Sequence, residues 1–207
     1  MWAIASGIEG NLAAYEAVVA DLKKLRQEVE NFYLLGDIIG PTAESNRLIK
    51  RIQQPRNEEP IPLVCQGWWE EQILILHALG RTGEPTELID RYGIGMTKML
   101  WDAIDSNTLE WVRALEFGFA ELDCFLIHGS SIDVSDELTP DTDPIQMIDR
   151  LSRMEANQLF CGRSGLAFEY KIESGSLTSQ VQTLDNLSSP TPTVLSPRRI
   201  IGVGEDR

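Results

Sequence analysis

The sequence predicts an α/β fold with parallel strands in its amino-terminal part. Short apolar runs at residues 2–5, 32–35 and 63–66 alternate with two stretches whose apolar residues recur at helical spacing. This strand–helix–strand–helix–strand order is typical of parallel strands joined by crossover helices. Several apolar runs end in a glycine followed by polar residues, which favours a functional cleft at the carboxyl ends of the strands.

The first half of the chain supplies this opening unit. After Gly10-Asn11, one apolar face of a helix is formed by Leu12, Tyr15, Val18, Val19, Leu22 and Leu25. A second helix around residues 48–52 stops before Pro55, and a polar loop over residues 54–62 leads to the third strand.

The middle of the chain, residues 70–115, is predicted to be mostly helical. It carries a Met- and Trp-containing stripe that we expect to pack in the core, formed by Met96, Met99, Leu100, Trp101 and Ile104. Residues 117–128 then alternate as a hairpin that turns at Asp123. A loop over 130–144, rich in Ser, Asp and Pro, precedes a helix over 145–154.

The last quarter returns to strands, expected at residues 159–161, 167–172, 177–184 and 193–203. No internal repeat or domain linker is visible, so the prediction is a single domain over residues 1–207. Residues 186–207 are a possible C-terminal extension or a set of incomplete last strands. A sheet edge left open there would favour pairing with a second copy or a partner.

Composition points to an acidic globular protein. The formal net charge is −14, with 18 basic and 32 acidic side chains, and hydrophobic residues make up 43% of the chain. Such an acidic surface disfavours binding to nucleic acid or to anionic membranes, and suits a basic partner. No apolar run is long enough to span a membrane and no secretory signal is present, so a cytoplasmic location is expected.

The three cysteines, Cys65, Cys124 and Cys161, lie in or beside apolar runs. Their number is odd and no C-x-x-C pair occurs, so neither a disulfide framework nor a zinc site is indicated. We expect buried, reduced thiols on strands.

Five segments place chemistry-bearing residues directly after predicted strands. They are Ser6-Gly7-Ile8-Glu9-Gly10-Asn11, Gly36-Asp37, Gly67-Trp68-Trp69-Glu70, His128-Gly129-Ser130 and Gly162-Arg163-Ser164-Gly165. Because strand ends gather at one edge of a sheet, the sequence predicts that these segments form one cleft.

In their order and spacing, over roughly residues 2–184, these motifs resemble the calcineurin-like metallophosphoesterases of the compact bacterial type. That family carries Asp-x-His-Gly-Asn, Gly-Asp, Gly-Asn-His-Asp/Glu, His-Gly and Gly-His-x-His after successive strands. The resemblance implies a four-layer α/β/β/α sandwich, in which two mixed β-sheets are flanked by helices. It also implies a cleft built to hold two metal ions.

The residues that stand at the family's metal-binding positions differ in this chain. The resemblance implies that Asp37 and His128 are remnant metal ligands and that Glu9 is a possible oxygen ligand. The remaining positions are taken by Gly7, Trp68, Trp69, Arg163 and Gly165. Glycine has no side chain that could ligate a metal, indole cannot ligate one, and Arg163 places a fixed positive charge where a cation would sit. Two metal ions cannot be held in the family's usual way by this set.

Three functional readings follow. The first is a non-catalytic metallophosphoesterase-fold protein that acts as a binding or scaffold module, with no cofactor and with Glu9, Asn11, Trp68, Trp69 and Arg163 lining the former cleft. The second is a divergent metal-dependent phosphoesterase that holds a single Mn, Fe or Zn ion weakly. The third is a cleft that binds a phosphate-containing small ligand without hydrolysing it, with Arg163 supplying the charge.

Several residues also have plain structural readings. Asp37 can cap a turn, and His128 can be a hydrogen-bonded residue at a strand end. Trp68 and Trp69 either fill the former cleft or form an exposed aromatic platform. Arg163 can pair with Asp37 or Glu9 and replace a metal electrostatically. The acidic segment 132–141 is either a solvated loop or a contact for a protein partner. A homo-oligomer also remains open.

Overall fold

The amino-terminal part forms three parallel strands with two helices on one face. The computed structural model describes residues 1–25, 29–80, 85–154, 156–172, 176–177, 193–194 and 197–204. The first elements are β1 (Trp2–Ala5), α1 (Leu12–Lys24), β2 (Asn31–Leu35), α2 (Ser45–Gln53) and β3 (Pro62–Cys65). The strand order is β1-β2-β3, with parallel pairing throughout. The predicted opening unit is therefore confirmed.

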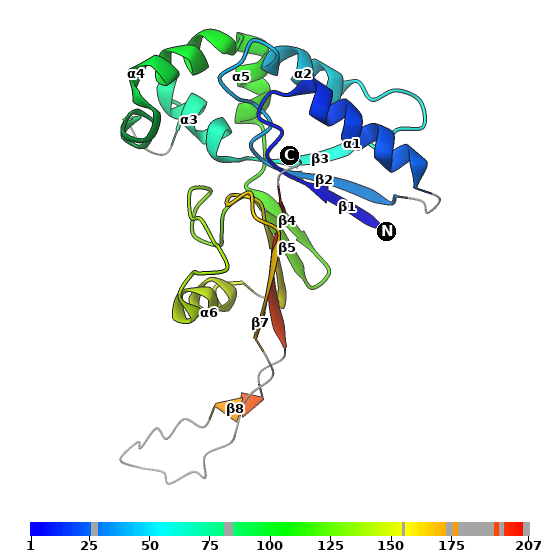
Figure 1. The fold of residues 1–207 in the computed structure, drawn as a ribbon, viewed down its shortest axis with the longest axis vertical. Coiled ribbons are helices and arrows are strands. Elements are labelled where there is room, and N and C mark those ends of the chain that lie inside the picture. Colours follow the sequence, from blue (N-terminus) through cyan, green and yellow to red (C-terminus); the bar gives the residue numbers. More distant parts are fainter. Residues whose placement is uncertain are drawn as a thin grey trace.

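Three helices follow β3 and extend the helical layer sideways (Figure 1). They are α3 (Trp68–Leu76), α4 (Thr86–Ala103) and α5 (Ser106–Arg113). The two expected helical segments around residues 88 and 96–104 both lie within α4 and are separated by a kink. That helix breaks at Gly93, whose backbone (φ 78°, ψ 168°) is far from helical and is of a kind that essentially only glycine adopts.

The second sheet has five strands in the order β4-β5-β6-β10-β7. The elements are β4 (Gly118–Glu121), β5 (Cys124–Ile127), α6 (Pro144–Ser152), β6 (Gln158–Cys161), β7 (Phe168–Ile172) and β10 (Arg198–Gly202). Strand β10 runs parallel to β6 and antiparallel to β7, so the sheet is mixed. A short separate ladder joins β8 (Ser176–Leu177) and β9 (Thr193–Val194), away from both sheets in Figure 1.

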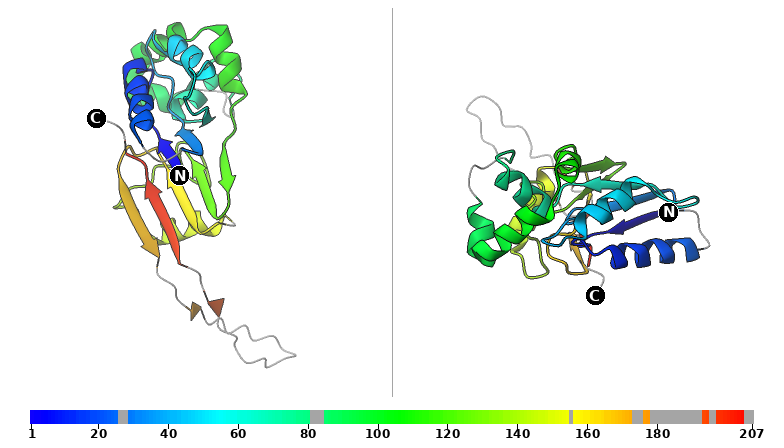
Figure 2. Two further views of the ribbon diagram at one scale, coloured as in Figure 1. Left: turned by 90° about the vertical axis from the view of Figure 1, so that its right-hand side faces the viewer. Right: turned by 90° about the horizontal axis from the view of Figure 1, so that it is seen from above.

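The layers are helices, three-stranded sheet, five-stranded sheet and α6, as Figures 1 and 2 show from different sides. Alternation along the strands produces them, because neighbouring side chains point to opposite faces. On β2, Phe32 and Leu34 pack under the helices, whereas Tyr33 and Leu35 pack against Leu126 of the second sheet. On β5, Ile127 faces the α6 side. The four-layer α/β/β/α fold is confirmed.

Some expectations for individual residues were wrong. Leu100 and Ile104 are buried, but Met99 and Trp101 are 54% and 47% exposed, because only one side of α4 contacts the rest of the helical layer. Cys65 and Cys161 are buried free thiols as predicted, whereas Cys124 is only half-buried on the hairpin strand β5.

The expected strand over residues 193–203 was also wrong, because β9 and β10 belong to different sheets. The expected strand over 177–184 lies outside the described residues apart from Leu177, and most of the tail from residue 186 lies outside them too. None of the helices in the described ranges is long and apolar enough to cross a bilayer.

The contact between the two sheets supplies the first testable prediction. Leu126 is fully buried in the cluster between them, whereas Leu122, in the turn just before the same strand, is 96% exposed. Leu126→Ala should lower the free energy of unfolding by about 2–5 kcal/mol, because it removes buried methyl groups and leaves a cavity. Leu122→Ala should change it by less than about 0.5 kcal/mol. Urea denaturation measures both, and equal effects would contradict the assignment of this core.

Candidate functional site

The predicted cleft segments do meet. The segments that follow β2, β3, β5 and β6 bring Trp69, His128 and Arg163 into contact with Asp37 beneath the helical layer. Glu9, from the loop after β1, joins them through its Oε1, which accepts a hydrogen bond from Trp69 Nε1 at 3.1 Å. Asn11 does not join the cluster in this way. It is exposed and caps α1, with Oδ1 accepting from the Ala14 N–H.

Two glycines allow the loops after β2 and β3 to cross. Gly36 has φ +65°, and a Cβ at Gly36 would lie 2.4 Å from the Gly67 Cα. In turn, a Cβ at Gly67 would lie 2.0 Å from the Asp37 backbone nitrogen. No side chain fits at either position, so the backbone after β2 runs directly against the start of α3.

Glu70 holds this crossing together. Its Oε1 accepts the N–H groups of Ile38 and Ile39, each at 2.8 Å. Its Oε2 accepts those of Asp37 at 2.8 Å and Gly67 at 2.9 Å. The side chain is fully buried at the third position of α3, where the helix dipole also favours a negative charge.

The ionisation of Glu70 reflects opposing influences. Burial and the charge of Asp37 raise its pKa, whereas the N–H groups of Ile39 and Ile38 lower it, and the net result is a pKa of about 7. Each oxygen accepts two N–H bonds, so protonation of either one would weaken two of them. The geometry therefore holds the ionised form.

Asp37 is the polar centre of the cluster. Its backbone lies in the left-handed region (φ 50°) and its side chain is almost fully buried. Oδ1 accepts the Trp69 N–H at 2.8 Å, so Asp37 binds the first turn of α3 rather than a turn of its own. Burial opposes its ionisation, but the charge of His128, together with contacts to Trp69 and Arg163, lowers the pKa of Asp37 below its usual value.

His128 connects Asp37 to the second sheet. Its Nδ1 lies 2.7 Å from the Leu35 carbonyl oxygen, which can only accept, so Nδ1 carries a proton. Its Nε2 lies 3.2 Å from Asp37 Oδ2, close enough for an ion pair although not aligned as a hydrogen bond. Burial lowers the pKa of His128, but the Asp37 carboxylate raises it more, so the net shift is upward.

Arg163 lies next to the same carboxylate. Its backbone N–H donates to the His128 carbonyl at 2.8 Å, and its side chain is 7% exposed. Nη1 lies 3.8 Å from Asp37 Oδ2, which is an ion pair without a hydrogen bond. The guanidinium carbon lies 4.8 Å from the centroid of the Trp68 ring, where it gains cation–π attraction.

The two tryptophans are buried and do not form an exposed platform. Trp68 is fully buried and Trp69 is 5% exposed, with their ring centroids 4.8 Å apart. Tyr92 of α4 packs on both, and Glu87 of α4 accepts a hydrogen bond from Trp68 Nε1 at 2.9 Å. Aromatic rings therefore fill the space above Asp37.

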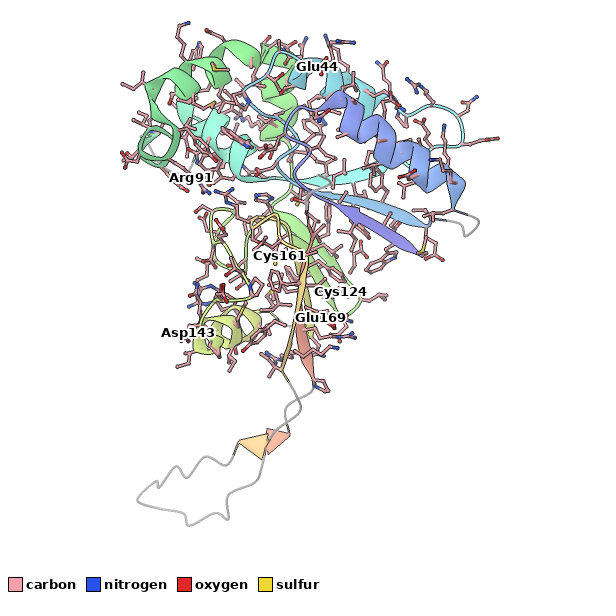
Figure 3. All side chains as sticks on the ribbon, viewed as in Figure 1. Glu44, Arg91, Cys124, Asp143, Cys161 and Glu169 are labelled. Atoms are coloured by element: carbon pink, nitrogen blue, oxygen red, sulfur yellow. The ribbon has the colours of Figure 1, made fainter. Side chains whose placement is uncertain are left out.

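Sequence reasoning missed the contribution of α4. Arg91 lies 5.9 Å from the centroid of Trp68 and 3.9 Å from Glu137, on the side of the helical layer that faces the segment after β5 (Figure 3). Nothing in the local sequence distinguishes Arg91 or Tyr92 from ordinary surface residues of a helix. The structural role of Glu70 could have been found, because an acidic residue three positions after Gly67 at a helix start is a capping signal.

The acidic segment 132–141 is held to the protein rather than extended in solvent. Val134 and Leu138 are buried, and Asp136 pairs with Arg150 of α6 at 2.6 Å. Ser130 also donates a hydrogen bond to Asp136. The outer side chains of the segment include Ile132, which is 43% exposed.

The donor set of the cluster does not fit two metal ions. Asp37 Oδ2 and His128 Nε2 face each other, but the neighbouring positions hold the Arg163 guanidinium and the Trp68 indole, neither of which ligates a metal. In the part of the chain that the structure describes, no three His, Cys, Asp or Glu side chains converge as a metal would require.

Comparison with solved structures shows a metallophosphoesterase-like fold. A metallophosphoesterase from Sphaerobacter thermophilus aligns with 98% of this chain and 75% of its own, at 16% identity and a TM-score of 0.62. A hypothetical protein from Pyrococcus horikoshii OT3 aligns with 99% of this chain and 76% of its own, at 19% identity and a TM-score of 0.64. No protein-family model and no curated protein matches the sequence. The likeness is therefore one of fold.

The pKa values of the two histidines should be shifted in opposite directions. Burial lowers the pKa of His77 below 6.5, whereas the pKa of His128 is raised above it. NMR titration of the two ring Cε1–H signals, with His77→Gln as the assignment control, should show His77 losing its proton first as the pH rises. Because the folded-state pKa of His128 is raised, its contribution to stability is complete below about pH 6.5 and is lost as the pH rises through the folded value. The reverse order would contradict the Asp37–His128 pairing.

Replacing Glu70 tests the crossing of the two loops. Glu70→Gln keeps the size of the side chain but puts an NH₂ group opposite backbone N–H donors. We expect the free energy of unfolding to fall by about 2–4 kcal/mol, because two buried donors lose their acceptor. Glu110→Gln, on the exposed surface of α5, is the matched control and should be neutral. A neutral Glu70→Gln variant in thermal denaturation would show that Glu70 does not hold the crossing.

Proposed function

We propose that this chain is a non-catalytic protein of metallophosphoesterase-like fold that acts as a binding or scaffold module. The observation that carries the proposal is the ion pair between Arg163 Nη1 and Asp37 Oδ2, 3.8 Å apart. In the resemblance to the metallophosphoesterases, Arg163 stands where a metal-ligating histidine would be and Asp37 is the bridging carboxylate. An internal cation therefore lies beside the group that would otherwise bridge two metals.

The electrostatics of the cluster support this reading. A buried carboxylate needs a positive partner, because removing it from water without one is costly. Arg163 and protonated His128 supply that charge to Asp37, so a bound metal is not needed to stabilise the buried carboxylate. A guanidinium stays charged at every physiological pH and would repel an incoming divalent cation.

The filled cleft supports it as well. Two-metal phosphoester hydrolysis requires an open site in which a water and a phosphoryl group reach both metals. Here Trp68 and Trp69 are buried beneath α4, and Gly7 and Gly165 have no side chains that could ligate. A binding role needs the fold but does not need an open site with metal ligands.

The surface indicates what such a module would bind. A net charge of −14 favours a basic protein partner over nucleic acid or an anionic membrane. The anchored segment 132–141 offers acidic side chains beside the exposed Ile132, and pairing with a second copy of the chain is a further way to form an assembly.

A single-metal phosphoesterase is the second candidate, and the orientation of His128 favours it. A metal-ligating histidine commonly donates its other ring N–H to a backbone carbonyl, and His128 does so to Leu35. Its Nε2 then points at Asp37 Oδ2, so two ligands converge. Glu9, the third candidate, is engaged by Trp69 instead.

Metal analysis combined with an activity assay separates the two candidates. We expect the purified protein to contain less than stoichiometric Mn, Fe or Zn, and to show no turnover of a phosphodiester above the buffer rate. Elemental analysis and release of p-nitrophenol from bis(p-nitrophenyl) phosphate measure these properties. Stoichiometric metal, together with turnover that chelation and Asp37→Ala both abolish, would instead establish the phosphoesterase.

A further inference from the structure

Arg163 has an unused pair of hydrogen-bond donors inside the protein. Its side chain is only 7% exposed. Even so, neither Nε nor Nη2 has a hydrogen-bond partner in the described part of the chain. A buried charged donor without an acceptor costs several times what an ordinary hydrogen bond contributes. The structure therefore contains a strong donor site that lacks its acceptor.

The position of the guanidinium is set by its surroundings. The Arg163 backbone N–H is bonded to His128, one face of the guanidinium lies against the Trp68 ring, and Nη1 leans toward Asp37. These contacts do not use the edge of the guanidinium that carries Nε–H and Nη2–H. That edge is the planar fork with which arginine binds two oxygens at once.

The carboxylates of the cluster are already engaged. Asp37 accepts from Trp69 and faces His128 with its two oxygens, and Glu70 accepts four backbone N–H groups. Glu9 accepts from Trp69 Nε1. None of these three carboxylates can turn to the fork without breaking its own contacts, so none of them is the missing acceptor.

We propose that the Nε–Nη2 fork of Arg163 binds a small oxyanion, a carboxylate or phosphate group that presents two oxygens to the two N–H donors. This inference rests on the proposed function, in which the Arg163–Asp37 ion pair takes the place of metal ions, and it assigns a ligand to that cluster. The acidic chain and the adjacent Asp37 disfavour highly charged ligands, so the oxyanion belongs to a small molecule of low charge.

The cover over the fork is a helix with few buried residues. Tyr92, Arg91 and Glu87 of α4 lie against Trp68, which in turn covers Arg163. Only Leu88, Leu100 and Ala103 of the 18 residues of α4 are buried, and the helix breaks at Gly93. Elements with so few buried contacts open at low cost, so movement of α4 with Trp68 gives a small ligand access to the fork.

Titration of the wild-type protein with inorganic phosphate and, separately, with acetate tests the proposal at constant pH and ionic strength. The Nε–H signal of Arg163 is followed by ¹H–¹⁵N NMR. The signal is assigned by correlating it with the side-chain carbons of Arg163. We expect a saturable downfield shift and a higher thermal midpoint with at least one anion. Tighter binding of acetate identifies a carboxylate ligand, and tighter binding of phosphate a phosphate ester.

Two arginines over the same tryptophan ring supply matched variants. Arg163→Lys keeps the charge but removes the fork, and should weaken binding about tenfold or more. Arg91→Gln removes a charge over Trp68 but leaves the fork, and should stay within about twofold of wild type. No shift with either anion, or equal losses in both variants, would overturn the proposal. Should Arg163→Lys fail to fold, the wild-type titration decides alone. Phosphodiester turnover would overturn the proposed function without affecting this result.

Discussion

The carboxylate of Glu70 is the constraint on which the rest of the structure depends. It accepts four backbone N–H groups from two loops that cross glycine against glycine. These bonds hold the left-handed turn at Asp37 and fix the start of α3 in the same place. Asp37 follows β2 and binds both the first turn of α3 and His128. Its carboxylate therefore links the three-stranded sheet, the helical layer and the second sheet.

Once that crossing is fixed, the site must balance two buried carboxylates. In a metallophosphoesterase the positive charge would come from metal ions. Here it comes from the protein itself, through Arg163 and His128 beside Asp37, with Trp68 and Trp69 in the remaining space. On the function proposed here, the fold would persist without metals, because side chains would meet the electrostatic requirement of its centre. This balance is incomplete, since the Nε and Nη2 donors of Arg163 have no acceptor among the described residues.

The order of elements was predictable from local pattern. Apolar runs and helical spacing predicted the first three strands, their helices, the hairpin and the last helix, because these signals depend on neighbours along the chain. Predictions about burial in the middle of the chain were less successful. Trp101 and Met99 belong to an apolar stripe, but α4 lies at the margin of its layer and both side chains are exposed. The local sequence pattern does not show which face of a helix contacts the rest of the protein.

For the site, the sequence alone determined which chemical groups stand at the strand ends and which are missing. Gly7 has no side chain, and the side chains of Trp68 and Arg163 do not ligate metals, so this conclusion follows from the sequence alone. Only the tertiary structure decided what the remaining groups do. Whether Arg163 would meet Asp37 or Glu9, and whether the tryptophans would face solvent, depended on how loops more than a hundred residues apart approach one another. Those approaches are set by glycine crossings, by backbone hydrogen bonds to Glu70 and by the packing of α4, all of which are long-range.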